Sequence, residues 1–249
     1  MNEELVSIIV PAYNCADFIA ETIESVIKQS YKNWELIIVD DCSSDDTAKV
    51  IEEYLLKDDR IHYFKNEKNL GAAMTRNNAV KQAKGRYMAF LDSDDLWQED
   101  KLKKQIEFMT KNNYSFTCTA YDKIDENGAS LNRIIEARVK TDYHALLKKN
   151  PGNSTVIYDA SVLGKHYIPD IKKRNDYVMW LQIIKKAGYV YGLQEVLGSH
   201  RVYSGSLSSN KKSLLKYHWF VYRKIEKLSF FYSAYLMVYW VLRTVLKFK

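Results

Sequence analysis

The first half of the chain alternates short runs of β-branched and aromatic residues with longer runs of helical periodicity. The strand-like runs are residues 5–11, 34–39, 61–64, 87–91 and 115–121, and the helical runs cover about 18–27, 47–54, 72–84 and 100–111. Such alternation is typical of β-α-β units and predicts an α/β fold, in which helices flank a mostly parallel, Rossmann-like sheet. The second half is less regular. There we expect a helix at 176–187, strands at 189–191 and near 200–203, and a helical tail.

Length and composition limit the class of protein. With 249 residues, of which 47% are hydrophobic, the chain can bury one substantial core. The three cysteines are odd in number and lack CxxC spacing, which argues against a disulfide framework and against a zinc site. The N-terminal Met-Asn-Glu-Glu lacks the basic and apolar regions of a secretory signal, so we expect a cytoplasmic protein.

Carboxylates follow two of the predicted strands. Asp40 and Asp41 come after the second strand, and Asp92, Asp94 and Asp95 come after the fourth. In an open α/β sheet, ligands bind outside the carboxyl ends of the strands. Hard divalent cations prefer oxygen ligands of this kind, often together with phosphates. The alternative is that the second group is a solvated acidic helix cap.

Four motifs in this region stand in a specific order. They are Pro11-Ala12-Tyr13-Asn14, the segment 39–45 (VDDCSSD), the segment 69–77 (NLGAAMTRN) and the segment 90–95 (FLDSDD). In this order they resemble family 2 of the nucleotide-sugar glycosyltransferases, which have the GT-A fold. The resemblance covers about residues 5–210, and the sequence is similar to transferases of teichuronic acid and capsular polysaccharides. It implies a catalytic domain at 1–210, with a nucleotide-binding half at 1–112 and an acceptor-binding half at 113–210, and a separate tail at 211–249.

The resemblance also implies how a UDP-sugar is bound. The backbone at Pro11 and the ring of Tyr13 would flank the uracil, because an aromatic face stacks on a base. Asp41 would accept the imide hydrogen of the base. Arg76 would lie beside the base or the diphosphate, and Asp92 would approach the ribose.

By the same resemblance, Asp94 binds a divalent metal, Mn²⁺ or Mg²⁺, which bridges the two phosphates and neutralises the leaving group. The segment 197–208 is similar to the flexible loop that follows the last strand in the family. Within it, Arg201 is a candidate diphosphate contact. Tyr203 stands where the family often has His, so no metal-binding role is carried over to it, and His200 is expected to pack.

Asp176 is the candidate catalytic base. It lies in the segment 173–181 (KRNDYVMWL), where the family commonly has Glu-Asp before an aromatic-rich helix, and Asn175 replaces the Glu. An inverting transfer needs one base to remove the proton of the acceptor hydroxyl. The alternative is that Asp176 is only a helix N-cap.

The tail carries much of the net charge of +6. Leu214, Val221, Ile225, Leu228 and Tyr232 fall on one helical face. The basic residues of the tail are Lys211, Lys212, Lys216, Arg223, Lys224 and Lys227. A basic amphipathic helix suits an anionic membrane surface, so we expect peripheral contact with the inner face of the cell membrane. The alternative is a helix that packs on the catalytic domain or on a dimer partner.

Other classes of function fit less well. The first strand is not followed by the GxGxxG of a dinucleotide-dependent oxidoreductase, and no nucleic-acid-binding motif is present, so we expect no nucleic-acid partner. The resemblance therefore implies an inverting, metal-dependent glycosyltransferase. It would move a sugar from a UDP-sugar to a hydroxyl of a lipid-linked or growing surface glycan. Two alternatives stay open, an inactive nucleotide-sugar-binding protein and a nucleotidyltransferase of related fold.

Overall fold

The protein is described by a computed structural model, which covers residues 3–203 and 211–244. The strands are β1 (Val6–Ala12), β2 (Trp34–Asp40), β3 (Ile61–Lys65), β4 (Tyr87–Phe90), β5 (Leu96–Trp97), β6 (Phe116–Ile124), β7 (Ser130–Ile135), β8 (Lys140–Thr141), β9 (Ile157–Asp159) and β10 (Val190–Arg201). The α-helices are α1 (Ala16–Ile27), α2 (Thr47–Leu55), α3 (Ala72–Gln82), α4 (Lys101–Asn112), α5 (Tyr143–Lys148), α6 (Ala160–Leu163), α7 (Asn175–Ala187), α8 (Lys211–Phe220) and α9 (Phe230–Thr244). A 3₁₀ turn, η1 (Asn153–Thr155), and a π-helical turn, η2 (Val221–Ile225), complete the described elements.

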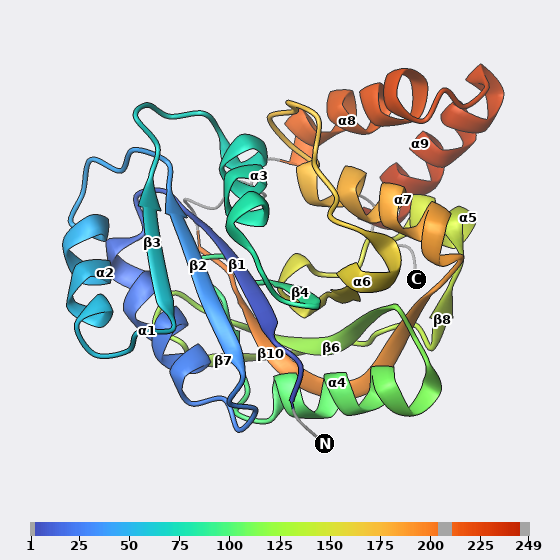
Figure 1. Ribbon diagram of the computed structural model, residues 1–249. Coiled ribbons are helices and arrows are strands. Elements are labelled where there is room, and N and C mark those ends of the chain that lie inside the picture. The colour runs from blue at the N-terminus through green and yellow to red at the C-terminus, as the bar shows by residue number, and fades with distance from the viewer. Residues whose placement is uncertain (1–2, 204–210, 245–249) are drawn as a thin grey trace.

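One mixed sheet runs through the molecule in the order β3-β2-β1-β4-β9-β6-β10-β5, with β7 paired to β6 and β8 paired to β10 (Figure 1). The neighbours β3, β2, β1 and β4 are all parallel, as the β-α-β pattern predicts. Beyond β4 the sheet becomes mixed, because β9 is antiparallel to both β4 and β6. The predicted α/β fold with helices on both faces is confirmed.

The two faces of the sheet bury separate cores, because successive side chains of a strand point to opposite faces. On β1, Ile8 packs with α1, α2 and α4, whereas Ile9 packs with α3, α7 and the tail. On β2, Ile38 belongs to the same core as Ile8, and Ile37 belongs to the same core as Ile9. Burial on both faces explains why these strands read as continuous apolar runs.

The second half differs from the sequence-based expectation. The two strands predicted at 189–191 and 200–203 are parts of one strand, β10. Its pairing with β6 shifts register between Leu193 and Val196 and again between Val196 and Ser199, and Gln194 and Glu195 are exposed there. These irregularities interrupt the apolar pattern in mid-strand, which is why the sequence indicated two strands.

The tail is not one continuous amphipathic helix. It folds as a hairpin of α8 and η2 followed by α9, and these elements lie against α7 (Figure 1). Val221 is fully buried, and Ile225, Leu228 and Tyr232 pack against the core of the domain. The apolar face that the sequence assigned to a membrane packs on the domain, as the alternative for the tail predicted, and peripheral membrane contact stays a prediction. The side chains of Lys211 and Lys212 lie outside the described residues. Within residues 3–203 and 211–244, no helix has the length and hydropathy needed to cross a bilayer.

Candidate functional site

The candidate site lies at the carboxyl ends of β1, β2 and β4. Because β1 pairs in parallel with both β2 and β4, the residues that follow these three strands meet at one edge of the sheet. Pro11 is half-buried there, and the ring of Tyr13 is 51% exposed. An exposed aromatic ring at this edge is available to stack on a planar ligand.

Asp41 organises the loop that leads into α3. Its carboxylate accepts hydrogen bonds from the backbone N–H groups of Leu70 and Gly71, at 2.7 and 2.8 Å, and from the side-chain amide of Asn66 at 2.9 Å. Gly71 has φ +81° and ψ 157°, a conformation that is essentially restricted to glycine. Asp41 is 3% exposed, so in this arrangement it holds the loop and offers only the remaining lone pairs of its oxygens to a base.

Arg76, on the first turns of α3, connects the two halves of the site. Its guanidinium donates to Asp92 at 3.1 Å and also to the side-chain oxygen of Asn175, at the start of α7. Arg76 is 4% exposed, so it is a buried bridge between the end of β4 and the helix that carries Asp176. Asn175 thus occupies the position of the family's Glu and still provides an acceptor for this arginine.

Asp92 stands where several charges meet. It also accepts a hydrogen bond from the side-chain amide of Asn153 at 2.8 Å. Loss of solvent raises the pKa of Asp92, and the negative charges of Asp94 and Asp176 raise it further, while the positive charge of Arg76 opposes them. The influence of Asp176 on this pKa places the two carboxylates within electrostatic reach of each other.

Asp94, like Asp92, is a half-buried carboxylate of the FLDSDD segment. The hydroxyl of Tyr203 hydrogen-bonds to it, and its negative charge contributes to raising the pKa of that tyrosine after burial, which is the larger cause. In the described part of the chain, no cluster of three or more His, Cys, Asp or Glu side chains could hold a metal by itself. The donor set fits a cation that takes one or two carboxylates from the protein and its other oxygens from phosphates and water.

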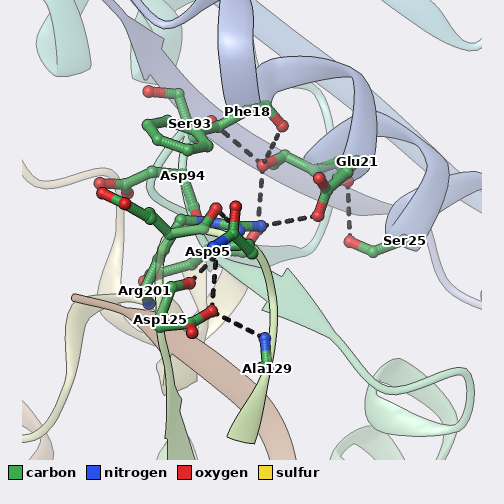
Figure 2. Close-up of polar contacts among 12 residues, drawn as sticks. Phe18, Glu21, Ser25, Ser93, Asp94, Asp95, Asp125, Ala129 and Arg201 are labelled. Carbon is green, nitrogen blue, oxygen red and sulfur yellow. Dashed lines mark hydrogen bonds and ion pairs between the residues drawn. The ribbon is translucent and has the colours of Figure 1, made fainter. Parts of the chain in front are cut away.

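Asp95 and Arg201 form a buried support beneath Asp94 (Figure 2). Asp95 is 1% exposed and accepts hydrogen bonds from the Ser154 hydroxyl and the Arg201 backbone N–H, and burial raises its pKa to about 7.

The Arg201 side chain is fully buried. It pairs with Glu21 at 2.7 Å, and its Nε donates to the Asp94 carbonyl at 2.9 Å. A direct diphosphate contact from Arg201 therefore requires Glu21 to be displaced. Residues 204–208 of the predicted flexible loop lie outside the described residues.

Asp176 lies in the first turn of α7. One of its carboxylate oxygens accepts a hydrogen bond from the side-chain amide of Asn150 at 2.9 Å. Asn150 belongs to a pocket that also contains Tyr121 and Gly152, and these two residues line a second pocket with Asp95 and His200. His200 packs at 5.8 Å from the Tyr121 ring.

The sequence did not reveal several residues that complete the site. Asn150, Asn153 and Ser154 supply the partners of Asp176, Asp92 and Asp95. They belong to the segment 150–155 (NPGNST), whose composition indicates a loop. That signal gives no indication of where the loop lies.

Comparison with known proteins places the chain in a family. The model of glycosyl transferase family 2 matches residues 7–168. The putative teichuronic acid biosynthesis glycosyltransferase TuaG of Bacillus subtilis is 43% identical over 98% of this chain and 97% of its own length. An Escherichia coli protein, the UDP-Glc:alpha-D-GlcNAc-diphosphoundecaprenol beta-1,3-glucosyltransferase WfgD, is 42% identical over 88% of this chain and 85% of its own.

Solved structures support the same fold. Staphylococcus aureus TarS, residues 1–349 in complex with UDP-GlcNAc, superposes with a TM-score of 0.73 at 22% identity and covers 97% of this chain and 72% of that one. The mannosyltransferase PcManGT of Pyrobaculum calidifontis, in complex with GDP-Man and Mn²⁺, has a TM-score of 0.70 at 17% identity over 96% of this chain and 70% of that one. The fold is of the GT-A type. Together with the family match and the identity to TuaG over nearly the whole chain, these comparisons show that the chain belongs to glycosyl transferase family 2.

Proposed function

We propose that the chain transfers a sugar from a UDP-sugar, with inversion, to a hydroxyl group of a lipid-linked or growing surface glycan. The contact of Arg76 with both Asp92 and Asn175 carries this proposal, because it joins the donor edge of the sheet to the helix of the candidate base. The names of the relatives support the substrate class. WfgD takes UDP-glucose and a diphosphoundecaprenol-linked GlcNAc, and TuaG is assigned to teichuronic acid synthesis.

In this proposal the sheet edge holds the donor. The uracil lies between the backbone at Pro11 and the exposed ring of Tyr13, and Asp41 accepts its imide hydrogen with the lone pairs that its loop contacts leave free. Asp92 approaches the ribose, and Arg76 lies beside the diphosphate. Arg201 supports the metal-binding residue from below, because it holds the Asp94 backbone.

A Mn²⁺ or Mg²⁺ ion bound by Asp94 would supply positive charge to the diphosphate as it leaves. The protein's own part in the reaction is to position the hydroxyl and accept its proton. The hydroxyl oxygen attacks the anomeric carbon, the bond to the diphosphate oxygen breaks, and UDP leaves with that electron pair. The hydroxyl proton moves to the oxygen of Asp176 that Asn150 does not occupy.

Peripheral membrane contact belongs to the same proposal, through a different surface from the one that the sequence suggested. Phe231, Tyr235, Val238 and Leu242 are all exposed on α9. Their spacing of four, three and four residues places them on one face of the helix. An apolar stripe on a helix beside basic side chains suits the interface of an anionic bilayer.

The test is UDP release from a panel of UDP-sugars with a prenyl-diphosphate-linked saccharide as acceptor, with and without Mn²⁺. We expect release that depends on the acceptor and the metal. An inactive binding protein releases no UDP under any condition, and a nucleotidyltransferase consumes a nucleoside triphosphate instead.

The role of Asp176 is tested with Asp176→Asn, which keeps the shape and removes most of the basicity. Turnover should fall by about 100-fold or more, the scale of losing a general base. Affinity for UDP and the free energy of unfolding should stay close to wild type. If Asp176 is only a helix cap, Asn serves equally well and turnover is nearly unchanged, which would leave the base unassigned.

A further inference from the structure

A pocket beside the candidate base has basic walls. Arg138, Lys149 and Asn150 are among its lining residues, together with Glu136. Arg138 comes from the link between β7 and β8, and Lys149 ends α5. A Cβ at Gly192 of β10 would lie 2.3 Å from the Arg138 carbonyl oxygen. Only glycine lets the strand approach so closely, so the position of Arg138 is built into the fold.

A third cation joins these two from the tail. Arg243, near the end of α9, donates to the Tyr239 hydroxyl at 3.1 Å. Burial lowers the pKa of Lys149, and the positive charges of Arg243 and Arg138 lower it further, while Glu136 opposes them most weakly. In residues 3–203 and 211–244, none of the three cations forms an ion pair with a carboxylate.

Tyr239 lies beside the same positive charges. Burial raises the pKa of its phenol, but the hydrogen bond from Arg243 and the charges of Arg243 and Arg138 outweigh it and lower the pKa overall. Like charges that converge without a counter-ion repel one another, and an anion placed among them removes that cost. The cluster therefore favours a ligand with more than one negative charge.

We propose that Arg138, Lys149 and Arg243 bind the diphosphate group of a lipid-linked saccharide acceptor. This proposal rests on the proposed function. Asn150 connects the pocket to the reaction, because it lines the pocket and donates to Asp176 at 2.9 Å. A saccharide that extends from this pocket toward Asp176 would present its hydroxyl to the base. Its lipid would leave along α9, which packs on α5 (Figure 1). This helix carries the exposed apolar stripe of Phe231, Tyr235, Val238 and Leu242.

Binding is measured directly by calorimetry with geranyl diphosphate, a water-soluble prenyl diphosphate, in EDTA so that no metal-bound donor site competes. We expect the dissociation constant to rise by about tenfold or more in Arg138→Gln and in Lys149→Gln, the scale of losing a charge-assisted contact. Lys111→Gln, exposed at the end of α4, serves as the control and should bind like wild type. Equal affinity in all three variants would overturn the proposal.

Kinetics separate the acceptor diphosphate from the headgroup of an anionic lipid, which has similar chemistry. In detergent, Arg138→Gln should raise KM for a diphosphate-linked acceptor and leave KM for the UDP-sugar unchanged, and Arg138→Lys should recover part of the loss. If the variant instead loses only binding to phosphatidylglycerol vesicles and keeps its KM, the cluster recognises the bilayer and the proposal is wrong. Because the calorimetry needs no turnover, it still decides the site if transfer itself is not observed.

Discussion

Asp94 and Asp95 are adjacent in the chain but have opposite surroundings. Asp95 is buried, and its two oxygens accept from Ser154 and from the Arg201 backbone, so it holds β4, η1 and β10 together. Asp94 is half-buried, and its backbone carbonyl is fixed by Arg201. Arg201 thus links the two residues, because its backbone N–H binds the Asp95 carboxylate and its side chain binds the Asp94 carbonyl oxygen, and this holds Asp94 in a defined position.

Replacement of Asp94 by Asn tests its assignment as the metal ligand. The variant should bind UDP about tenfold or more weakly in Mn²⁺, because a neutral amide is a poorer ligand for a hard cation. In EDTA the two proteins should bind UDP equally weakly. Calorimetry with UDP measures both, and unchanged affinity in Mn²⁺ would count against Asp94.

Lys101 predicts a pH dependence of stability. It is fully buried, with a hydrogen bond to Gln105 at 2.8 Å and the Trp97 ring at 4.2 Å, and burial lowers its pKa from 10.5 to about 7. Between these two values the unfolded chain binds a proton that the folded chain does not, so the free energy of unfolding should rise with pH. Below about pH 7 both states are protonated, and this contribution is constant.

Lys101→Met removes that contribution. The variant should be more stable than wild type by about 2 kcal/mol near pH 7, and the difference should shrink toward pH 10. Urea unfolding between pH 6.5 and 9.5 gives the two curves, and Lys111→Met, at the exposed end of the same helix, should follow wild type. Parallel curves for wild type and Lys101→Met would show that Lys101 is not neutral in the folded protein.

At the scale of elements, the loop before α3 is held from one end of β2. Asp41 accepts from Leu70 and Gly71, and this fixes the start of the helix that carries Arg76. The position of the start of α3 therefore depends on a backbone conformation at Gly71 that is essentially restricted to glycine.

Gly71→Ala should destabilise the protein by about 1–3 kcal/mol and also weaken UDP binding, because Asp41 and Arg76 lose their common loop. Gly164→Ala is a matched control. Gly164 has similarly strained angles, φ 78° and ψ 172°, at the end of α6. It should lose comparable stability and keep its affinity for UDP. Equal UDP affinity in the two folded variants would separate the loop from the donor site.

The sequence predicted those elements whose burial leaves a clear pattern. The strands β1–β4 and the helices α1–α4 and α7 show continuous apolar runs or helical periodicity. The resemblance pointed to Asp92, Arg76 and Asp176, whose roles stay predictions. The sequence did not predict β9, whose three residues are too few to show a period. The sequence also did not reveal Asn150 and Asn153. Asn150 lies 26 residues from its partner Asp176, and Asn153 lies 61 residues from its partner Asp92, so only the tertiary fold brings each pair together.

In the whole molecule, the apolar residues of the tail form two sets, one buried and one exposed. One set, which includes Val221 and Leu236, is buried and joins the hairpin to the domain. The other set is the exposed stripe of α9, and basic residues at Lys148 and Arg243 flank it. A helix that only packed on the domain would need no such stripe, so the second set indicates a further contact.

Phe231→Ser/Val238→Ser tests whether that contact is a bilayer. Both side chains are exposed, at 84% and 58%, so the double variant should keep the fold, which removal of the whole tail would not because its core residues would be lost. Loss of two apolar contacts at the interface should weaken partition into phosphatidylglycerol vesicles by about tenfold or more. Leu56→Ser/Val162→Ser, which removes two exposed apolar side chains from other surfaces, should float with the vesicles like wild type. If both double variants float equally well, α9 does not face the membrane. If the α9 variant changes the sedimentation coefficient instead of flotation, the stripe pairs two copies of the chain.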